Sequence, residues 1–225
     1  RIAVKYMTPV VVLSDSYLAS SAEPWRLPDV AALPRQGIAF RTDPDGFFPY
    51  LRDTETLARP WAIPGTPGLE HRIGGLEKQD GAGNISYDPL NHETMVRLRA
   101  AKVEAVAQDV PDVVPAGDAD GDLLVVGWGS THGAITAALR ALRGRGRRVG
   151  HVHLRHLNPL PRNLGEVLGR YRRVLVPELN MGQLALVLRA RYLVDAVSYP
   201  KVQGKPFMQA ELEARIEEML AGGGR

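Results

Sequence analysis

The sequence predicts an α/β protein whose second half is a doubly wound, mostly parallel sheet. Two aliphatic runs, at residues 123–126 and 174–176, show no polar alternation, which is typical of strands buried on both faces of a parallel sheet. Each run leads through a turn rich in Gly or Asn into an amphipathic segment. Repetition of this strand–turn–helix unit is the pattern of α/β folds.

Further elements of the second half follow the same alternation. Strands are expected at 122–127, 148–154, 173–177 and 194–198, and helices at 132–143, 163–169, 181–191 and 208–220. This order predicts parallel strands joined by right-handed crossovers. The Gly-rich residues 222–225 are expected to fray.

The chain opens on residues 1–7, which read as the last turns of a helix, so we expect the C-terminal part of a longer protein. Residues 9–13 are aliphatic and predict a buried strand that ends at Ser14-Asp15-Ser16. Because open α/β sheets bind ligands at the carboxyl ends of their strands, Asp15 is a candidate for substrate or cofactor contact. A helix cap or a turn explains the same tripeptide equally well.

Residues 22–68 contain eight prolines, which exclude a long helix and predict a loop-rich arm. Six aromatic residues in this arm indicate packing on a neighbouring surface, for which a partner subunit is a natural candidate. The charged, Gly-rich loop 70–84 holds Lys78 and Asp80 as candidate functional side chains, although a surface hairpin accounts for it about as well. A helix at 92–108 and a linker at 111–120 complete the first half.

Composition narrows the class of protein. The chain has 225 residues, of which 44% are hydrophobic and 24% charged, as in an ordinary globular protein, and no run is long enough to span a membrane. With no recognisable leader either, a cytoplasmic location is expected. The absence of cysteine excludes disulfides, thiolate catalysis and a cysteine-held metal cluster in this chain, so any redox cluster must belong to another one.

The turn at 127–133 offers Ser130 and Thr131 as caps for the following helix, whose free N–H groups could hold an anion. A capped helix is the favoured interpretation, and no nucleotide is assigned because the spacing matches neither the P-loop nor the dinucleotide fingerprint. Three histidines, His151, His153 and His156, lack a carboxylate at ligand spacing, so no metal site is predicted.

Ten arginines and a single acidic residue, Glu166, occupy residues 140–173. This basic run, with Arg147 and Arg148 at its centre, can steer an anion or an acidic protein, or it can be a set of solvated helix ends. Glu178 and Asn180 follow a strand and can contact a partner or cap the next helix. No nucleic-acid motif and no Gly-x-Ser-x-Gly elbow occur.

Several short motifs, in one order along the chain, resemble the alpha subunit of 2-oxoacid:ferredoxin oxidoreductases, in particular the 2-oxoglutarate branch. They are Val10-Val-Val-Leu-Ser-Asp-Ser-Tyr-Leu18, Arg72-Ile-Gly-Gly-Leu-Glu-Lys-Gln-Asp-Gly81, Asn91-His92 with Arg99 and Lys102, Gly129-Ser-Thr131, Asn158-Pro-Leu-Pro161 and Glu178-Leu-Asn-Met-Gly-Gln183. By that resemblance residues 1–58 are the tail of a pyrimidine-binding-type domain, residues 59–117 a connecting arm with one helix, and residues 118–222 a transketolase C-terminal-like domain.

The resemblance implies an enzyme of central carbon metabolism that oxidises 2-oxoglutarate with coenzyme A and ferredoxin, giving succinyl-CoA, CO₂ and reduced ferredoxin. It also implies that thiamine diphosphate, Mg²⁺ and the iron–sulfur cluster lie mainly on a partner beta subunit, commonly in a heterotetramer, and that neither nucleic acid nor membrane is a partner. Another 2-oxoacid, such as pyruvate or a branched-chain acid, and a non-catalytic basic α/β binding module are the alternatives.

Two motifs of the family, Tyr-Pro-Ile-Thr-Pro and Gly-Pro-Ser-Thr-Gly, are not among these residues, so the resemblance assigns no catalytic residue to the chain. Related chains often continue Gly-Leu-Glu with His-Asp, where this chain has Lys78-Gln79-Asp80. At Asp80 this chain therefore departs from the family's pattern.

Overall fold

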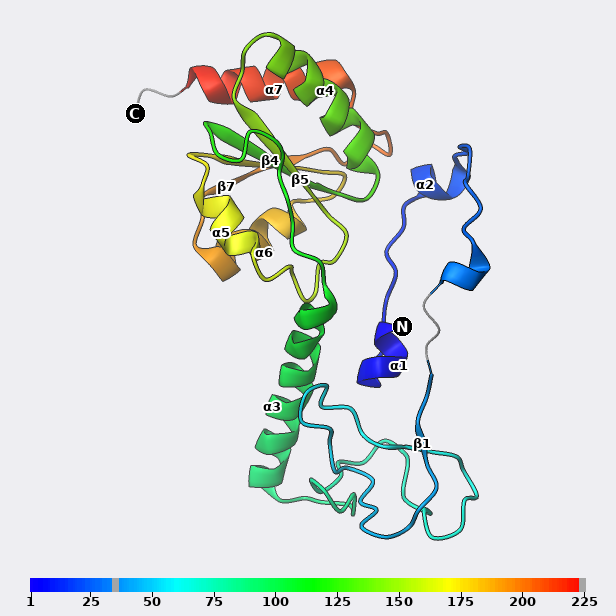
Figure 1. Cartoon of the computed structure of the whole chain (residues 1–225). Coiled ribbons are helices and arrows are strands. Elements are labelled where there is room, and N and C mark those ends of the chain that lie inside the picture. The colour runs from blue at the N-terminus through cyan, green and yellow to red at the C-terminus, as the bar shows by residue number, and fades with distance from the viewer. Residues whose placement is uncertain (34–36, 223–225) are drawn as a thin grey trace. The chain divides into compact units, whose positions relative to one another are not determined.

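The computed structural model describes residues 1–33 and 37–222, which form two compact units (Figure 1). Unit 1 comprises Arg1–Val12 and Pro24–Val110, and unit 2 comprises Leu13–Glu23 and Pro111–Arg225. The expectation that residues 222–225 fray stays a prediction, since residues 223–225 lie outside the described residues. The three-part division at residues 58 and 117 stays a prediction.

Unit 2 is built on a five-stranded sheet with the order β3-β5-β4-β6-β7. The strands are β3 (Ala116–Gly117), β4 (Leu123–Trp128), β5 (Val149–Leu154), β6 (Val174–Glu178) and β7 (Ala196–Pro200). β4 to β7 are parallel, and β3 is antiparallel to β5. The predicted doubly wound, mostly parallel sheet is therefore confirmed. The two-residue β3 lies inside the predicted linker, where no aliphatic run marks it.

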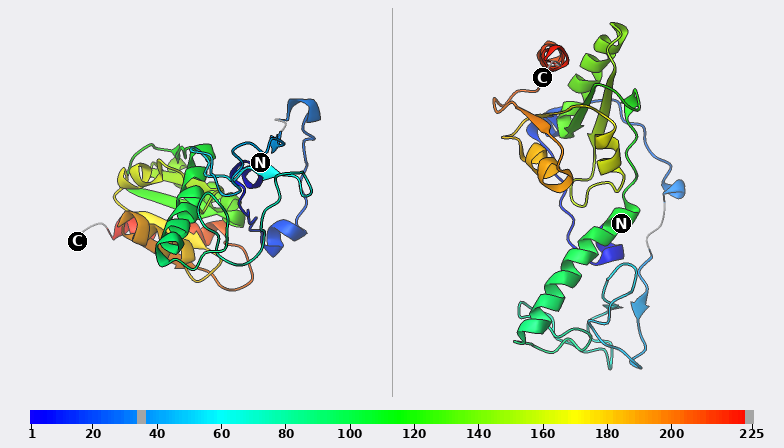
Figure 2. Two further views of the ribbon diagram at one scale, coloured as in Figure 1. Left: turned by 90° about the horizontal axis from the view of Figure 1, so that it is seen from below. Right: turned by 90° about the vertical axis from the view of Figure 1, so that its left-hand side faces the viewer.

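Helices cover both faces of this sheet (Figures 1 and 2). One face packs against α4 (His132–Gly144) and α7 (Gln209–Ala221), and the other against α5 (Leu164–Gly169) and α6 (Gln183–Tyr192). Side chains alternate along β4, so Leu123 and Val125 join the α4/α7 core while Leu124 and Val126 join the α5/α6 core. All four are fully buried, as an uninterrupted aliphatic strand requires.

Unit 1 has little regular structure apart from one long helix, α3 (Pro89–Ala105), which continues as the 3-10 helix η2 (Val106–Asp109). Asp88 caps α3 by accepting a hydrogen bond from the Leu90 N–H at 3.1 Å. The remaining elements are α1 (Ile2–Tyr6), η1 (Val30–Ala32), β1 (Phe40–Arg41) and β2 (Trp61–Ala62). The predicted loop-rich arm is thus confirmed over its described residues.

The N-terminal helix is fastened to η2 within unit 1. Tyr6 is 1% exposed and packs with Val106 and Val110 in a small core. The Lys5 ammonium lies 2.8 Å from a carboxylate oxygen of Asp109. Among the helices in residues 1–33 and 37–222, none combines the length and the hydropathy needed to cross a membrane.

The strand predicted at residues 9–13 is wrong. This segment is not a strand and pairs with no strand of the described residues, and Val11 and Val12 are 79% and 86% exposed. An aliphatic run favours β structure but forms a buried strand only where neighbouring strands bond its backbone and helices cover its faces. A short helix, α2 (Ser16–Ser20), follows it in unit 2.

Candidate functional site

The carboxyl ends of β4 and β6 form one wall of a pocket of about 230 Å³ in unit 2. Its lining consists of Leu13, Ser14, Asp15, Leu18, Trp128, Gly129, Ser130, Thr131, Leu179 and Asn180. The structure thus brings together four of the residues singled out from the sequence, namely Asp15, Ser130, Thr131 and Asn180. We call this site the carboxyl-edge pocket, since open α/β sheets place ligands at this edge.

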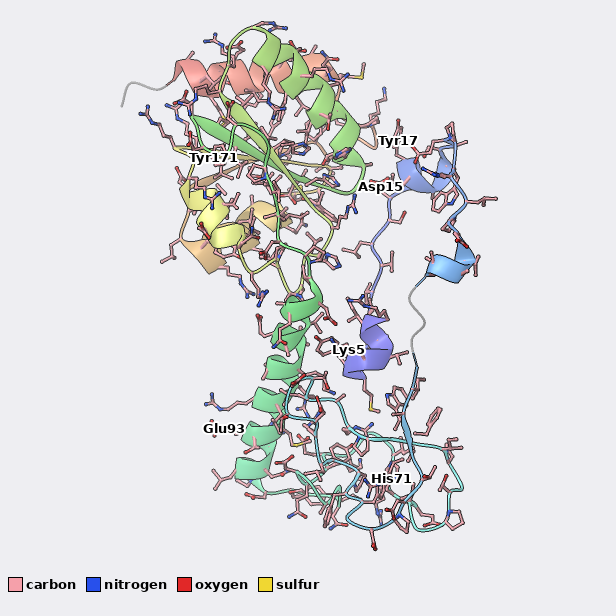
Figure 3. All side chains as sticks on the ribbon, in the orientation of Figure 1. Lys5, Asp15, Tyr17, His71, Glu93 and Tyr171 are labelled. Atoms are coloured by element: carbon pink, nitrogen blue, oxygen red, sulfur yellow. The ribbon has the colours of Figure 1, made fainter. Side chains whose placement is uncertain are left out.

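Asp15, which is labelled in Figure 3, lies at the start of α2, and both of its carboxylate oxygens accept hydrogen bonds. One oxygen accepts from the Leu18 N–H at 3.0 Å, which caps α2, and the other accepts from the Ser130 hydroxyl. Burial raises the pKa of the Asp15 carboxyl, but the hydrogen bonds from Ser130 and Leu18 outweigh it and hold the pKa below its ordinary value. Asp15 is therefore ionised at neutral pH.

Thr131 closes the turn between β4 and α4. Its hydroxyl donates to the Trp128 carbonyl at 2.8 Å and accepts from the Trp128 N–H at 3.1 Å. Gly127 is required here because a Cβ would lie 2.8 Å from the Thr131 hydroxyl and 2.5 Å from the Ile135 side chain. Thr131 therefore holds the turn that positions Ser130 in the pocket wall, and the expected capping of α4 by its side chain is wrong, because that side chain makes no capping hydrogen bond to α4.

Glu178 is fully buried at the end of β6, behind the pocket. Its two carboxylate oxygens accept from the N–H groups of Leu184 at 2.9 Å and Ala185 at 3.0 Å, which are free donors in the first turn of α6. The indole N–H of Trp128 lies 3.4 Å from the same carboxylate. Glu178 thus joins β6, α6 and one pocket wall, and contact with a partner stays a prediction.

Asn180 shapes the loop between β6 and α6. Its side-chain oxygen accepts from the N–H groups of Gly182 at 2.8 Å and Gln183 at 3.3 Å. Gly182 has φ +95°, and a Cβ there would lie 2.5 Å from the Ser198 hydroxyl. Asn180 therefore stabilises the turn that leads into α6, at the rim of the pocket, and its contact with a partner stays a prediction.

Lys78 and Asp80 belong to unit 1 and line no part of the carboxyl-edge pocket. They lie in a hairpin-like loop in which Lys78 and Ile85 form an antiparallel bridge. Lys78 is 4% exposed, and its ammonium donates to the carbonyl of Gly74 at 3.1 Å. The Asp80 N–H and the Lys78 carbonyl both bond the Asn91 amide, so the loop is fixed to the start of α3.

The basic run of residues 140–173 is extensively paired with carboxylates from elsewhere in unit 2. Arg147 lies 2.8 Å from Glu217, and Arg148 pairs with Asp120. Acidic residues distant in the chain therefore offset part of the arginine excess of this sequence window. Exposed pairs of this kind contribute at most about 1 kcal/mol each, and contact of Arg147 and Arg148 with an anion or a partner stays a prediction.

The histidines of β5 meet a third from α4 rather than His156. The ring centroids of His132, His151 and His153 lie 4.7 to 6.0 Å apart. Burial, followed by the neighbouring histidines, lowers the pKa of His151 to about 3 and that of His153 to about 4. Within the described ranges, no group of three His, Cys, Asp or Glu side chains is placed to hold a metal ion.

A second pocket, of about 450 Å³, lies in unit 1, and of its lining residues the sequence analysis singled out only Lys78 as a candidate functional side chain. Its cationic lining includes Arg52, Arg59, Arg99 and Lys102, which come from a loop and from α3. The available signal was the spacing of Arg99 and Lys102, which places them on one face of a helix. Nothing local connects them to residues 52 and 59.

Replacing Asp15 with alanine is expected to loosen α2, because it removes both the helix cap and the Ser130 contact. Loss of a cap of this kind costs about 1 kcal/mol, so amide exchange across residues 16–20 is expected to be about fivefold faster by hydrogen–deuterium mass spectrometry. The matched control is Asp29→Ala, which removes the cap of η1 and should leave those peptides unchanged. Equal exchange in Asp15→Ala and the wild type would contradict the assignment.

Comparison with known proteins identifies the group to which the chain is related. Residues 121–201 match the family described as pyruvate:ferredoxin oxidoreductase core domain II. The 2-oxoglutarate oxidoreductase subunit KorA of Mycobacterium tuberculosis is 56% identical over 99% of this chain, which covers 34% of that protein. The alpha subunit of 2-oxoacid:ferredoxin oxidoreductase 1 from Aeropyrum pernix is 32% identical over 99% of the chain, which covers 36% of it.

A solved structure agrees with these relatives. The 2-oxoglutarate:ferredoxin oxidoreductase of Magnetococcus marinus, with 2-oxoglutarate, coenzyme A and succinyl-CoA bound, superposes with a TM-score of 0.89 at 29% identity. The match covers 97% of this chain and 38% of that one, so the chain spans about a third of the length of these proteins. The chain is therefore similar over nearly its whole length to about a third of the alpha subunits of 2-oxoacid:ferredoxin oxidoreductases, and it includes a match to core domain II of the pyruvate:ferredoxin oxidoreductase family.

Proposed function

We propose that these residues are part of the alpha subunit of a 2-oxoglutarate:ferredoxin oxidoreductase. The reaction would convert 2-oxoglutarate, coenzyme A and oxidised ferredoxin into succinyl-CoA, CO₂ and reduced ferredoxin. The observation that carries the proposal is the 56% identity to a 2-oxoglutarate oxidoreductase subunit over 99% of the chain. The Magnetococcus structure, which contains both 2-oxoglutarate and coenzyme A, supports the same substrates.

The partners belong to the same proposal. We infer a beta subunit that carries thiamine diphosphate, Mg²⁺ and an iron–sulfur cluster, which supply decarboxylation and one-electron transfer. The chain has no cysteine, and its described residues hold no group of three His, Cys, Asp or Glu side chains placed for a metal ion, so neither the cluster nor the Mg²⁺ is assigned to it. The cytoplasmic location expected from the sequence is part of this proposal.

Within that assembly, we assign the carboxyl-edge pocket of unit 2 a binding role. Its walls combine apolar surface from Leu13, Leu18 and Leu179 with the ionised carboxylate of Asp15 and the hydroxyl of Ser130. A pocket with a few fixed polar groups in an apolar lining is the usual form of a small-molecule or segment-binding site. The chain thus supplies binding walls, while the bond-breaking chemistry belongs to the cofactors.

The activity is tested on the intact protein, purified with the subunits that accompany it. We expect reduction of methyl viologen that requires both 2-oxoglutarate and coenzyme A. Pyruvate and a branched-chain 2-oxoacid serve as matched substrates that lack the second carboxylate or replace it with an apolar chain. Turnover with pyruvate or the branched-chain acid but not with 2-oxoglutarate would agree with a 2-oxoacid:ferredoxin oxidoreductase and contradict 2-oxoglutarate as its substrate. No turnover with any 2-oxoacid would favour a non-catalytic binding module.

A further inference from the structure

The 450 Å³ pocket of unit 1 collects more positive than negative side chains. It is lined by Tyr50, Arg52, Arg59, Gly74, Gly75, Leu76, Glu77, Lys78, Met95, Arg99 and Lys102. Five of these carry positive charge, and Glu77 carries the negative charge. We call this site the basic pocket, and its net charge is the feature that needs an explanation.

The cations of the basic pocket lie close enough to oppose one another's charge. Lys102 is 8% exposed, and burial lowers its pKa to about 8, with further contributions from Arg52 and Arg59. Burial, followed by the charge of Arg59, also lowers the pKa of Arg52. Holding like charges together in a partly buried site is unfavourable unless an opposite charge is present.

The charges within the chain compensate these cations incompletely. The carboxylate of Glu77 is shared by Arg99, at 3.1 Å, and His92. The charge of Asp80 favours the protonated form of Arg52, yet the pKa of Arg52 remains lowered. Carboxylates therefore offset part of the positive charge on the pocket wall and leave an excess.

The donors of the pocket are only partly used by acceptors of the described residues. The Nε of Arg52 is buried and has no hydrogen-bond partner among the described residues, although its Nη1 donates to the Leu57 carbonyl at 3.0 Å. Arg59 places its guanidinium 4.7 Å from the centre of the Tyr50 ring, which fixes its plane. Lys102 donates to the Met7 carbonyl at 3.3 Å, a long bond that leaves ammonium donors for another acceptor.

We propose that the basic pocket binds a small molecule through a dianionic oxygen group, either a phosphate ester or a dicarboxylate, held by Arg52, Arg59 and Lys102. Guanidinium forks suit both groups, since each offers two or more acceptor oxygens with delocalised negative charge. A volume of about 450 Å³ leaves room for the organic part of such a molecule beside its charged group. The inference rests on the charges of unit 1 and holds whichever reaction the protein catalyses.

The test is calorimetric titration of the intact protein at pH 7 and low ionic strength with four probes. Inorganic phosphate and 2-oxoglutarate distinguish phosphate from dicarboxylate, and coenzyme A with dephospho-coenzyme A tests a phosphate monoester carried by a larger molecule. The variants Arg59→Gln and Lys102→Met each remove one positive charge while keeping most of the side-chain volume. Arg97→Gln is the control, because Arg97 lies on the same helix, pairs with Glu93 at 2.6 Å and does not line the pocket.

We expect at least one probe to bind, and each pocket variant to weaken that binding about tenfold while Arg97→Gln leaves it unchanged. A second binding event that persists in the variants would belong to another site. Lys102→Met is expected to fold, because it relieves like-charge repulsion, and an unfolding temperature no lower than that of the wild type checks this. Failure of all four probes to bind, or binding equally tight in Arg59→Gln and in the wild type, would overturn the proposal.

Discussion

Replacing Glu178 with alanine is expected to lower the local stability around α6 by about 3 kcal/mol, because two buried hydrogen bonds to a charged acceptor are lost and a cavity remains. Glu178 is fully buried, and its carboxylate satisfies the N–H groups of Leu184 and Ala185. Both amides then lose their acceptor in a dry environment. Hydrogen–deuterium exchange of peptides covering residues 183–188 is expected to be about a hundredfold faster than in the wild type.

Two further variants separate this role from a general effect of removing charge. Glu178→Gln keeps one acceptor oxygen but presents an amide N–H₂ group to a helix donor, so an intermediate loss is expected. Glu166→Ala removes an exposed carboxylate that pairs with Arg170, which is worth less than about 0.5 kcal/mol. If Glu178→Ala and Glu166→Ala exchange alike at residues 183–188, Glu178 does not hold α6.

Acidification is expected to destabilise unit 2 below pH 6.5, and His151→Phe is expected to reduce this effect. The pKa of His151 in the folded protein is about 3, against an ordinary value of 6.5, so the unfolded chain binds the additional proton between these two values. The contribution of His151 to the free energy of unfolding is therefore fully present well above pH 6.5 and is lost as the pH falls. Between pH 6.5 and pH 4 the loss due to His151 is about 3 kcal/mol.

The comparison is made by urea denaturation at pH 7 and pH 4, with local exchange of residues 149–154 as a second measure. His151→Phe keeps a planar ring in a site where Nε2 has no hydrogen-bond partner among the described residues. His156→Phe, after the end of β5, is the matched control and should retain the full pH dependence of the wild type. A pH dependence equal in wild type and His151→Phe would show that His151 is not the group concerned.

The sheet of unit 2 could be predicted because its signals are local. Uninterrupted aliphatic runs mark β4 and β6, and turns rich in Gly or Asn lead from them into helices with a buried face. The strand predicted at residues 9–13 failed because a local run carries no information about which strands will pair with it. β3 was not predicted because its two residues show no local strand signal and are assigned as a strand only because they pair with β5.

The candidate functional site could be predicted where its residues carry a local sequence signal. Asp15, Ser130 and Asn180 were singled out because each follows an aliphatic run or a Gly-rich turn, and all three line the carboxyl-edge pocket. The capping interpretation of Thr131 was wrong, because its hydroxyl bonds the backbone of Trp128 before the helix instead of a free N–H group of α4. Lys78 was also singled out and lines the basic pocket, but the pocket itself was missed because residues 52, 59 and 102 approach one another only through the folding of the loop-rich arm.

The antiparallel edge strand β3 has a consequence for self-association. Arg143 donates to the carbonyls of Ala116 and Val149, at 2.9 Å for Val149, and so secures β3 against β5. A parallel sheet that ended at β5 would present a bare row of backbone donors and acceptors to other chains. A two-residue strand that ends at Gly117, with φ +95°, leaves too short a ladder to template a further one. The β3 edge of the unit 2 sheet is therefore expected to resist pairing with strands of other chains, and Arg143 contributes by holding β3 in place.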